Sequence, residues 1–282
     1  MLGNKLIFIT SALSRRLVAL GKQMQRSGID VYFAAPMGDS VQWITDGRYI
    51  RLGKLGSRLF GAGRIKNFDS TAVCFDNAAA QLADRAKLKK ICFFDEIGID
   101  LSVWSPKAVS GNLQTMLLSS YNVPPQSKMI LVLDPSEKDI KRLILANQGL
   151  DHSDFILALH GKINKCIARK INRRLKTTPN IVYLGSEPDL PSLMRASFAI
   201  ISLSAGNNFY KVAAMAMGRT AAFPSGGAIK PNIATDGDLE TVLKRILSLP
   251  LKTREEFEAK NIRFAAAHSL EKNIIKLKSM IK

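Results

Sequence analysis

Four short turns along the chain carry residue types that suit a pyrophosphate. They span residues 135–138, 161–162, 204–209 and 226–227, and each follows an apolar run. Every turn is glycine-rich, hydroxyl-bearing or basic, and backbone N–H groups at the start of a helix attract anions. A single turn of this kind indicates only ordinary turn chemistry, because glycines end strands in any α/β protein. Four in series favour an anion-binding edge.

The runs around these turns predict the elements that position them. Short apolar runs at residues 128–134, 153–161, 180–185 and 198–204 are typical of buried parallel strands. Helical patterns separate them, and residues 238–282 show apolar side chains three and four apart. In a doubly wound sheet, ligands bind at the carboxyl ends of the strands. The four turns should therefore lie on one edge of a sheet.

The same alternation opens the chain. Strand-like runs span residues 6–10, 29–36, 70–75 and 91–97, and helical patterns span 17–28 and 77–90. Two prolines in the segment at 122–128 can continue neither a helix nor a central strand. We therefore predict an α/β protein with two Rossmann-like doubly wound domains facing across a cleft. The predicted domains are 1–124 and 125–282, and the second includes the C-terminal helices.

The second half resembles a known family. The segments NIVYLG, DLPSLMRASFAIISLS and KVAAMAMGRTAAFPSGG are similar to the C-terminal domain of GT-B glycosyltransferases, especially the family-four (group 1) retaining enzymes. In that family, two acids flank a Gly-Phe turn before an Ala-Met-Ala-x-Gly helix. The resemblance places them at Ala205 and Ala213, which are alanines here. Alanine can neither bind a ribose hydroxyl nor contact the transferred sugar through a carboxylate.

The resemblance also implies a nucleotide-sugar donor and the residues that hold it. Lys138 matches the lysine of an Arg and Lys pair that neutralises the diphosphate, whereas Leu133 stands near the place of the arginine. Lys162 either compensates or is a solvated helix-start residue. Gly206 permits close backbone approach, and the neighbouring asparagines either replace lost hydrogen bonds or serve the turn. The predicted donor-binding residues are Lys138, Gly161, Lys162, Ser204, Gly206, Asn207, Asn208 and Phe209.

In the first half, the resemblance holds only in outline. It implies an acceptor-side histidine or acid near Asp95 and Glu96, at the carboxyl end of the strand-like run 91–97. These acids are the predicted catalytic residues, and helix capping is the alternative role.

The charge and composition of the chain limit the classes of partner that we expect it to bind. The chain has 41 basic and 23 acidic residues and a formal net charge of +18, which attracts polyanions. Basic side chains cluster at 162–176, and between 46 and 69 they alternate with large apolar ones, a mixture suited to an anionic membrane surface. The alternative interpretation of either cluster is a solvated charged surface. Nucleic acid ranks third, because aromatic residues are sparse and no recognition motif is present.

Cysteine and histidine usage argues against metal and disulfides. Cys74, Cys92 and Cys166 are widely spaced and predict reduced core residues of a cytosolic protein. The three histidines show no ligand spacing, so we expect no metal, and no cofactor apart from the donor substrate. The N-terminal apolar run ends at Arg15 and Arg16 and predicts a buried strand, and no window is long enough for a spanning helix.

Together these patterns predict a cytoplasmic glycosyltransferase-like protein, peripheral on the inner face of the membrane. It would move a sugar from a nucleotide donor to a lipid-linked or cell-envelope glycan acceptor, as in lipopolysaccharide or polysaccharide biosynthesis. The alternative is a catalytically degenerate relative that keeps the GT-B fold and acts as a binding or scaffold partner.

Overall fold

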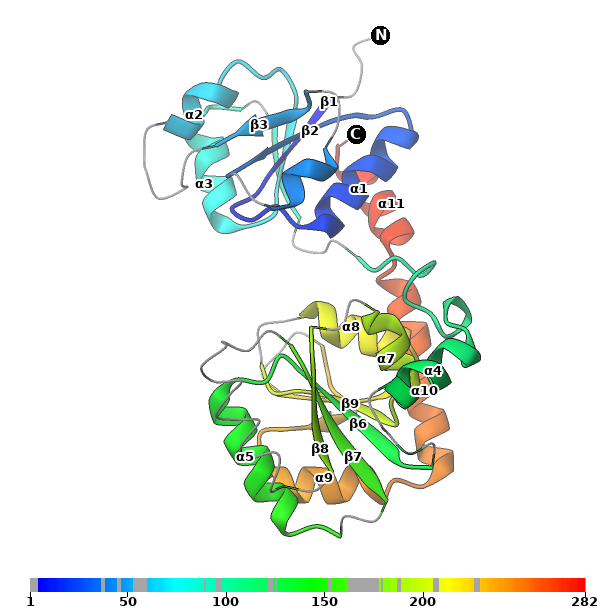
Figure 1. Ribbon diagram of the computed structural model, residues 1–282. Coiled ribbons are helices and arrows are strands. Elements are labelled where there is room, and N and C mark those ends of the chain that lie inside the picture. Colours follow the sequence, from blue (N-terminus) through cyan, green and yellow to red (C-terminus); the bar gives the residue numbers. More distant parts are fainter. Residues whose placement is uncertain are drawn as a thin grey trace. The chain divides into compact units, whose positions relative to one another are not determined.

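The computed structural model contains two compact units, each built on one parallel sheet (Figure 1). One unit comprises Met1–Gly98 and His268–Lys282, and the other comprises Ile99–Ala267. The residues described are 5–36, 39–44, 47–52, 60–88, 90–94, 98–120, 124, 126–151, 154–161, 178, 180–186, 189–204, 208–225 and 229–281. Two separate α/β units, each with a parallel sheet, confirm the predicted α/β class with two Rossmann-like domains.

The first unit has a five-stranded sheet in the order β3-β2-β1-β4-β5. Its strands are β1 (Lys5–Ile9), β2 (Asp30–Ala35), β3 (Tyr49–Arg51), β4 (Thr71–Cys74) and β5 (Lys90–Phe93). The helices are α1 (Arg15–Arg26), α2 (Phe60–Ile65), α3 (Asn77–Arg85) and α11 (Leu270–Ile281), with a 3-10 turn at Asp39–Trp43. Every strand pair is parallel.

Both faces of this sheet are covered, as a parallel sheet requires. Along β1, Leu6 and Phe8 pack with side chains of α1 and α11, whereas Ile7 and Ile9 pack with those of α2 and α3. The period of two thus assigns alternate residues to opposite cores. Cys74 and Cys92 are buried and free, as predicted, and Cys166 lies outside the described residues. Burial, with Asp76 and Cys92 nearby, raises the pKa of Cys74 to about 12, so its thiol stays protonated.

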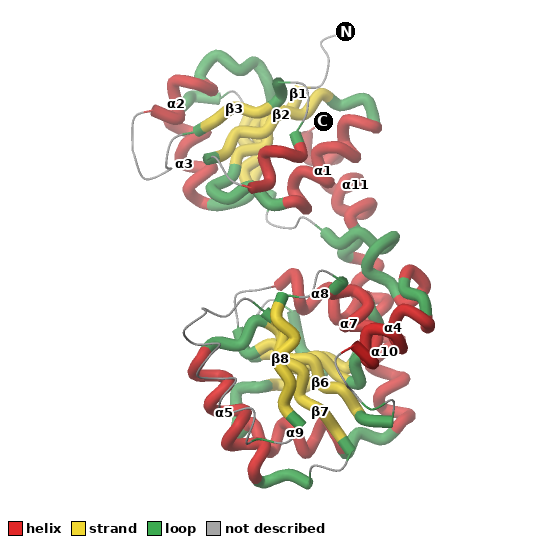
Figure 2. The backbone as a smooth tube through the Cα atoms, viewed as in Figure 1, coloured by secondary structure: helices red, strands yellow, loops and turns green. Residues whose placement is uncertain are grey.

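The second unit has a six-stranded sheet in the order β11-β10-β9-β6-β7-β8 (Figure 2). Its strands are β6 (Lys128–Leu133), β7 (Phe155–His160), β8 (Ile181–Gly185), β9 (Ala199–Ser202), β10 (Thr220–Phe223) and β11 (Ile233–Ala234). The helices are α4 (Gly111–Ser120), α5 (Glu137–Gln148), α7 (Leu190–Ala196), α8 (Asn208–Ala216), α9 (Leu239–Leu247) and α10 (Leu251–Ala267), with a 3-10 turn at Pro106–Ala108.

The helices of this unit divide between the two faces of its sheet. Residues of α5 and α9 pack on the face that carries Ile130 and Val132, and residues of α7, α8 and α10 pack on the face that carries Leu131 and Leu133. The strand order reverses between β6 and β9, which is the arrangement of a Rossmann fold. The predicted runs at 128–134, 180–185 and 198–204 therefore lie in the same sheet.

The division of the chain differs from the predicted domains 1–124 and 125–282. Helix α4 packs against α7, and Trp104 and Leu118 pack on the core of the second unit. Helix α11, at the end of the chain, instead contributes Leu270, Ile274 and Leu277 to the core of the first unit. The proline segment that we used as a boundary therefore lies inside the second unit, because apolar side chains on both sides of it share one core.

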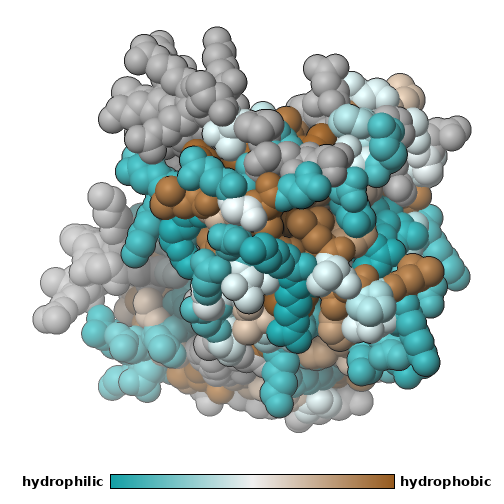
Figure 3. Space-filling view, turned by 90° about the horizontal axis from the view of Figure 1, so that it is seen from below, coloured by the Kyte–Doolittle hydropathy of each residue, from teal (hydrophilic) through white to brown (hydrophobic). Residues whose placement is uncertain are grey.

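Figure 3 shows one face on which hydrophobic surface lies between hydrophilic side chains. Exposed large hydrophobic residues come from many separate elements, and they include Trp43, Val103, Met116, Leu145, Leu251 and Ile275. Of the helices described, none combines the length and the apolar character needed to cross a bilayer.

Close packing at Gly98 ties α11 to the first unit. Gly98 and Gly28 both have φ of +82°, a conformation that L side chains avoid. A Cβ at Gly98 would lie 2.9 Å from the Cα of Leu270, whereas a Cβ at Gly28 would meet nothing within 4 Å. We therefore expect Gly98→Ala to lower the free energy of unfolding by roughly 1–3 kcal/mol more than Gly28→Ala does.

Urea unfolding with hydrogen exchange on α11 would measure this difference. Both variants carry the same backbone strain, so the excess at Gly98→Ala reports the contact with α11 alone. Equal losses in the two variants would contradict the packing described here.

Candidate functional site

The carboxyl ends of β6 and β9 form the candidate site. These strands pair in parallel with Leu133 opposite Ser202, so the turns that follow them begin at the same edge. Helix α5 starts at Glu137 after the first turn, and α8 starts at Asn208 after the second. The strand order reverses here, and in open α/β sheets ligands bind at such a reversal. Two helix N-termini therefore begin at the expected place.

The turns after β6, β7 and β8 are joined by hydrogen bonds. The Asp134 N–H donates to the His160 carbonyl at 2.8 Å, and the Gly161 N–H donates to the Gly185 carbonyl at 2.8 Å. The Tyr183 hydroxyl donates to the Gly161 carbonyl, also at 2.8 Å. Asp134 itself has φ of 43°, which costs energy for a non-glycine residue. The edge is thus a connected set of turns.

Gly161, a predicted donor-binding residue, has a clear steric role. Its φ is 145°, and a Cβ here would lie 2.4 Å from the Asp134 carboxyl oxygen Oδ1. The residue is buried. Glycine is therefore required for the turns after β6 and β7 to approach each other.

The start of α5 carries its own acids. The Ser136 Oγ accepts from the Asp139 N–H at 3.2 Å, while the Asp139 carboxylate accepts from the Ser136 N–H at 3.0 Å. This capping box uses N–H groups that sequence reasoning left free for a phosphate. Lys138 lies between these two residues and is exposed. The positive charge of the helix start is therefore partly neutralised, and Lys138 is an exposed cation in its first turn.

After β9, Ser204 is exposed and Phe209 is half-buried. The Phe209 ring packs edge-on against Trp104, with 5.1 Å between centroids, and lies 5.8 Å from the Tyr210 ring. Phe209 therefore holds the first turn of α8 to the core of the second unit, a packing role that its place in the turn did not reveal.

Sequence reasoning missed a buried lysine in α8. Lys211 is 0 % exposed, and its Nζ lies 5.9 Å from the centroid of the Phe223 ring, at the carboxyl end of β10. A lysine inside the apolar segment FYKVAAMAM was the available signal, since a buried ammonium must be paired or hydrogen-bonded. It adds a positive charge two residues before Ala213, whose side chain is fully buried.

Several predicted residues fall outside the described part of the chain. These are the catalytic candidates Asp95 and Glu96, the donor-site candidates Lys162, Gly206 and Asn207, the motif position Ala205, and the turn at 226–227. Of Asn208, the structure describes the backbone, which begins α8. Among the described candidates, Lys138, Gly161, Ser204 and Phe209 all belong to the carboxyl edge of one sheet.

The first unit has a comparable edge, where sequence reasoning missed Asp76. Its carboxylate accepts from the Ser11 N–H at 2.7 Å, the Thr10 hydroxyl at 3.2 Å and the Ala79 N–H at 2.8 Å. Burial alone would raise the pKa of Asp76, but these hydrogen bonds to the ionised form lower it overall. Asp76 therefore caps α3 and fixes the turn after β1. An aspartate directly before an alanine-rich helix was the sequence signal.

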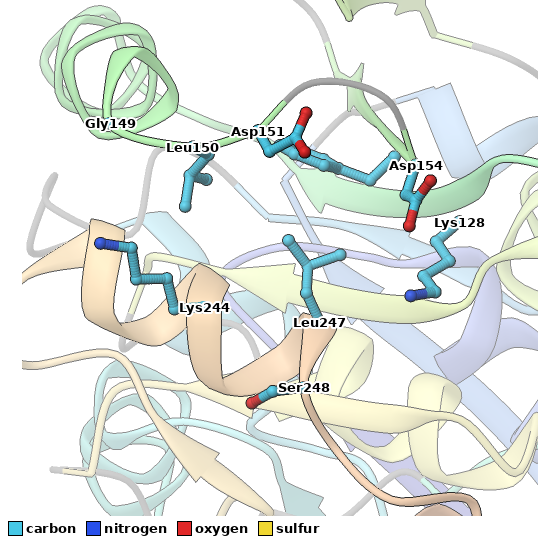
Figure 4. Close-up of a pocket in the computed structure, with 9 residues that line it drawn as sticks. Lys128, Gly149, Leu150, Asp151, Asp154, Lys244, Leu247 and Ser248 are labelled. Carbon is cyan, nitrogen blue, oxygen red and sulfur yellow. The ribbon is translucent and has the colours of Figure 1, made fainter.

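A cavity of about 460 Å³ lies at the other edge of the second sheet (Figure 4). It opens beside the first residues of β6 and β7 and the last turns of α5 and α9. Its lining residues are Lys128, Gly149, Leu150, Asp151, Asp154, Phe155, Lys244, Leu247 and Ser248. None of the predicted donor-binding residues lines it.

Comparison with known proteins identifies the fold. No protein-family model matches the chain, and no curated protein sequence matches it. Among solved structures, a glycosyltransferase from Rickettsia africae is similar, with 16 % identity, full coverage of both chains and a TM-score of 0.75. WaaG, a glycosyltransferase involved in lipopolysaccharide biosynthesis, has 12 % identity, 99 % coverage of both chains and a TM-score of 0.65.

A third similar structure is HepE from Anabaena in complex with UDP and glucose. It shares 12 % identity, covers 98 % of this chain and 99 % of its own, and has a TM-score of 0.62. At these identities the likeness shows the fold alone, which is of the GT-B type.

The role of Gly161 can be tested by adding one methyl group. Because the new Cβ would strike the Asp134 carboxylate, we expect Gly161→Ala to lower the free energy of unfolding by roughly 1–3 kcal/mol. Gly185→Ala is the control, since Gly185 also has a positive φ but has nothing within 4 Å of its Cβ position. Denaturant unfolding measures both, and a loss at Gly185→Ala as large as that at Gly161→Ala would refute the steric role.

Asp76 should make stability depend on pH. The pKa of Asp76 in the folded state lies below the ordinary value of 3.8. Its contribution to the free energy of unfolding is therefore present above pH 3.8 and is lost as the pH falls through the folded pKa. In Asp76→Asn, the side-chain amide has one acceptor oxygen where the carboxylate has two, so some of these hydrogen bonds are lost. The variant should be less stable than the parent at neutral pH, and the gap should close below about pH 4. Urea unfolding from pH 7 to pH 3 measures the gap, and a constant gap would contradict this assignment.

Proposed function

We propose that this protein is a glycosyltransferase that binds a nucleotide sugar at the carboxyl edge of its second sheet. The observation that carries the proposal is that α5 and α8, which carry Lys138 and Lys211, both begin after the paired strands β6 and β9 at the reversal of strand order. Support comes from similar GT-B structures, of which HepE is in complex with UDP and glucose.

The proposed chemistry moves a sugar between two oxygens. The bond from the sugar C1 to the diphosphate breaks, the electron pair leaves with the nucleotide, and the acceptor hydroxyl oxygen bonds to C1. Cations stabilise the charge that develops on the leaving diphosphate. In this proposal Lys138 and Lys211 supply that charge with the first N–H groups of α8. Asp95 and Glu96 remain the candidates for receiving the acceptor proton.

The edge described here favours contacts to the diphosphate over contacts to the sugar. The two acids of the family would stand at positions 205 and 213, where this chain has Ala205 and Ala213. Ala213 is fully buried among apolar side chains. We therefore expect the free nucleoside diphosphate to bind nearly as tightly as its sugar conjugate. The same observation supports a second candidate function, namely a GT-B protein that binds a nucleotide without transferring sugar.

The acceptor is proposed to be a lipid-linked or cell-envelope glycan, reached from the cytoplasmic face of a membrane. The formal net charge of +18 supports attraction to an anionic surface. WaaG, one of the similar structures, acts in lipopolysaccharide biosynthesis, which supports an envelope glycan as the acceptor class.

Thermal shift with nucleotides and nucleotide sugars tests donor binding. A donor at one hundred times its dissociation constant should stabilise the protein by about 2.7 kcal/mol. Lys138→Gln should weaken this binding about tenfold, because one charge-assisted contact to the diphosphate is lost. Lys141→Gln is the matched control, since Lys141 is exposed on the same helix and pairs with Glu137 at 3.0 Å. If no nucleotide raises the melting temperature, donor binding is refuted.

Lys211→Met tests the buried lysine in the same assay. Because a buried ammonium is paired or hydrogen-bonded, its removal leaves polar groups in the interior without their partner, which is destabilising. We expect a lower melting temperature than that of the parent, with weaker nucleotide binding at a temperature where both proteins are folded. Release of nucleoside diphosphate from a bound sugar conjugate would then distinguish transfer from binding alone.

A further inference from the structure

Three arginines from separate elements meet at the amino-terminal edge of the second sheet. Arg195 lies in the last turn of α7, Arg219 directly precedes β10, and Arg254 lies in the first turn of α10. The Arg195 Nη1 donates to the Met217 carbonyl at 3.4 Å, and the Arg219 Nη2 donates to the Arg195 carbonyl. These two arginines thus bind the last carbonyls of α8 and α7. We call the three residues the arginine cluster.

The charge of the arginine cluster is poorly balanced. Glu258, on α10, pairs with Arg195 at 3.5 Å. Glu258 also opposes the repulsion that Arg195 and Arg254 exert on Arg219. Burial lowers the pKa of Arg219 to about 10, and repulsion from Arg195 and Arg254 adds to this while Glu258 opposes it. Among the described residues, the three guanidinium groups therefore make one ion pair, that of Arg195 with Glu258.

Arg254 is held in a position that suits recognition of an anion. Its guanidinium carbon lies 4.3 Å from the centroid of the Phe198 ring, and the Lys128 Nζ lies 5.6 Å from the same centroid. A guanidinium stacked on an aromatic ring keeps its planar N–H edges available for a phosphate or carboxylate. The Nε atoms of Arg219 and Arg254 are both buried and have no hydrogen-bond partner among the described residues. Lys128 adds a fourth cation beside the cluster.

We propose that the arginine cluster binds an oxyanion of the phosphate type. A doubly charged phosphate would relieve the repulsion among the guanidinium groups and accept several charge-assisted hydrogen bonds. The site lies at the amino ends of β6, β9 and β10, opposite the carboxyl edge proposed for the donor. It is therefore distinct from the donor site and independent of the proposed function. The phosphate comes either from a soluble phosphate or from a lipid headgroup.

Thermal shift against sodium phosphate, with sodium chloride at matched ionic strength, tests the proposal on the full chain. Phosphate should raise the melting temperature saturably, beyond the chloride series. Arg254→Gln should weaken phosphate binding about tenfold, through the loss of one bidentate charged contact. Glu258→Gln should strengthen it about twofold to fivefold, because a competing carboxylate is neutralised. Opposite effects of two substitutions on one helix are not expected from a merely structural role.

Arg263→Gln is the matched control, since Arg263 is exposed on α10 and makes the same change of charge. It should leave phosphate binding unchanged. Equal shifts in phosphate and chloride, or equal weakening by Arg254→Gln and Arg263→Gln, would overturn the proposal. Co-sedimentation with phosphatidylcholine vesicles, with and without phosphatidic acid, identifies the source. A lipid headgroup predicts Arg254-dependent binding to phosphatidic acid, and a soluble phosphate predicts a phosphate-induced shift without such binding.

Discussion

The pairing of β6 with both β7 and β9 is the constraint on which the rest of the second unit depends. A central parallel strand must be covered on both faces, so the chain must leave β6 through a helix and return on each side in turn. At the point of reversal, the turns after β6 and β9 leave the same edge. The hydrogen bonds from Asp134 to His160 and from Gly161 to Gly185 extend this edge to β7 and β8. Pairing of the backbone strands alone therefore brings the turns of the candidate site to one edge of the sheet.

Charge is distributed unequally between the two edges of this sheet. At the carboxyl edge, Glu137 and Asp139 lie in the first turn of α5 beside the exposed Lys138, and Lys211 of α8 is buried. At the amino edge, Arg195 and Arg219 bind the C-terminal carbonyls of α8 and α7, as cations near helix ends commonly do. Arg254 takes no part in these two hydrogen bonds, so its charge is additional to that of the capping arginines. This additional positive charge is the physical basis of the proposed oxyanion site.

Much of the fold was predictable from local patterns. The runs of apolar residues predicted the strands β1, β2, β4 and β6 to within about two residues, because a doubly buried strand has no polar face to obscure it. Glycine was expected to stop the first helix at Gly28. Helix α1 ends at Arg26, and Gly28 has a φ of +82°. Local chemistry also explains the capping of α5 by Ser136. The sequence could not indicate that Asp139 would compete with a phosphate there, because capping depends on side-chain rotamers.

The sequence by itself determined which segments form strands and helices and which turns follow the strands, since these depend on neighbours a few residues apart. Tertiary structure alone decided that α11 joins the first unit, that Lys211 is buried at the carboxyl edge, and that Arg195, Arg219 and Arg254 meet. Each of these results requires residues distant in the chain to share a core or an edge. The physical reason is that burial and charge repulsion depend on distances in space, which periodicity and spacing do not contain.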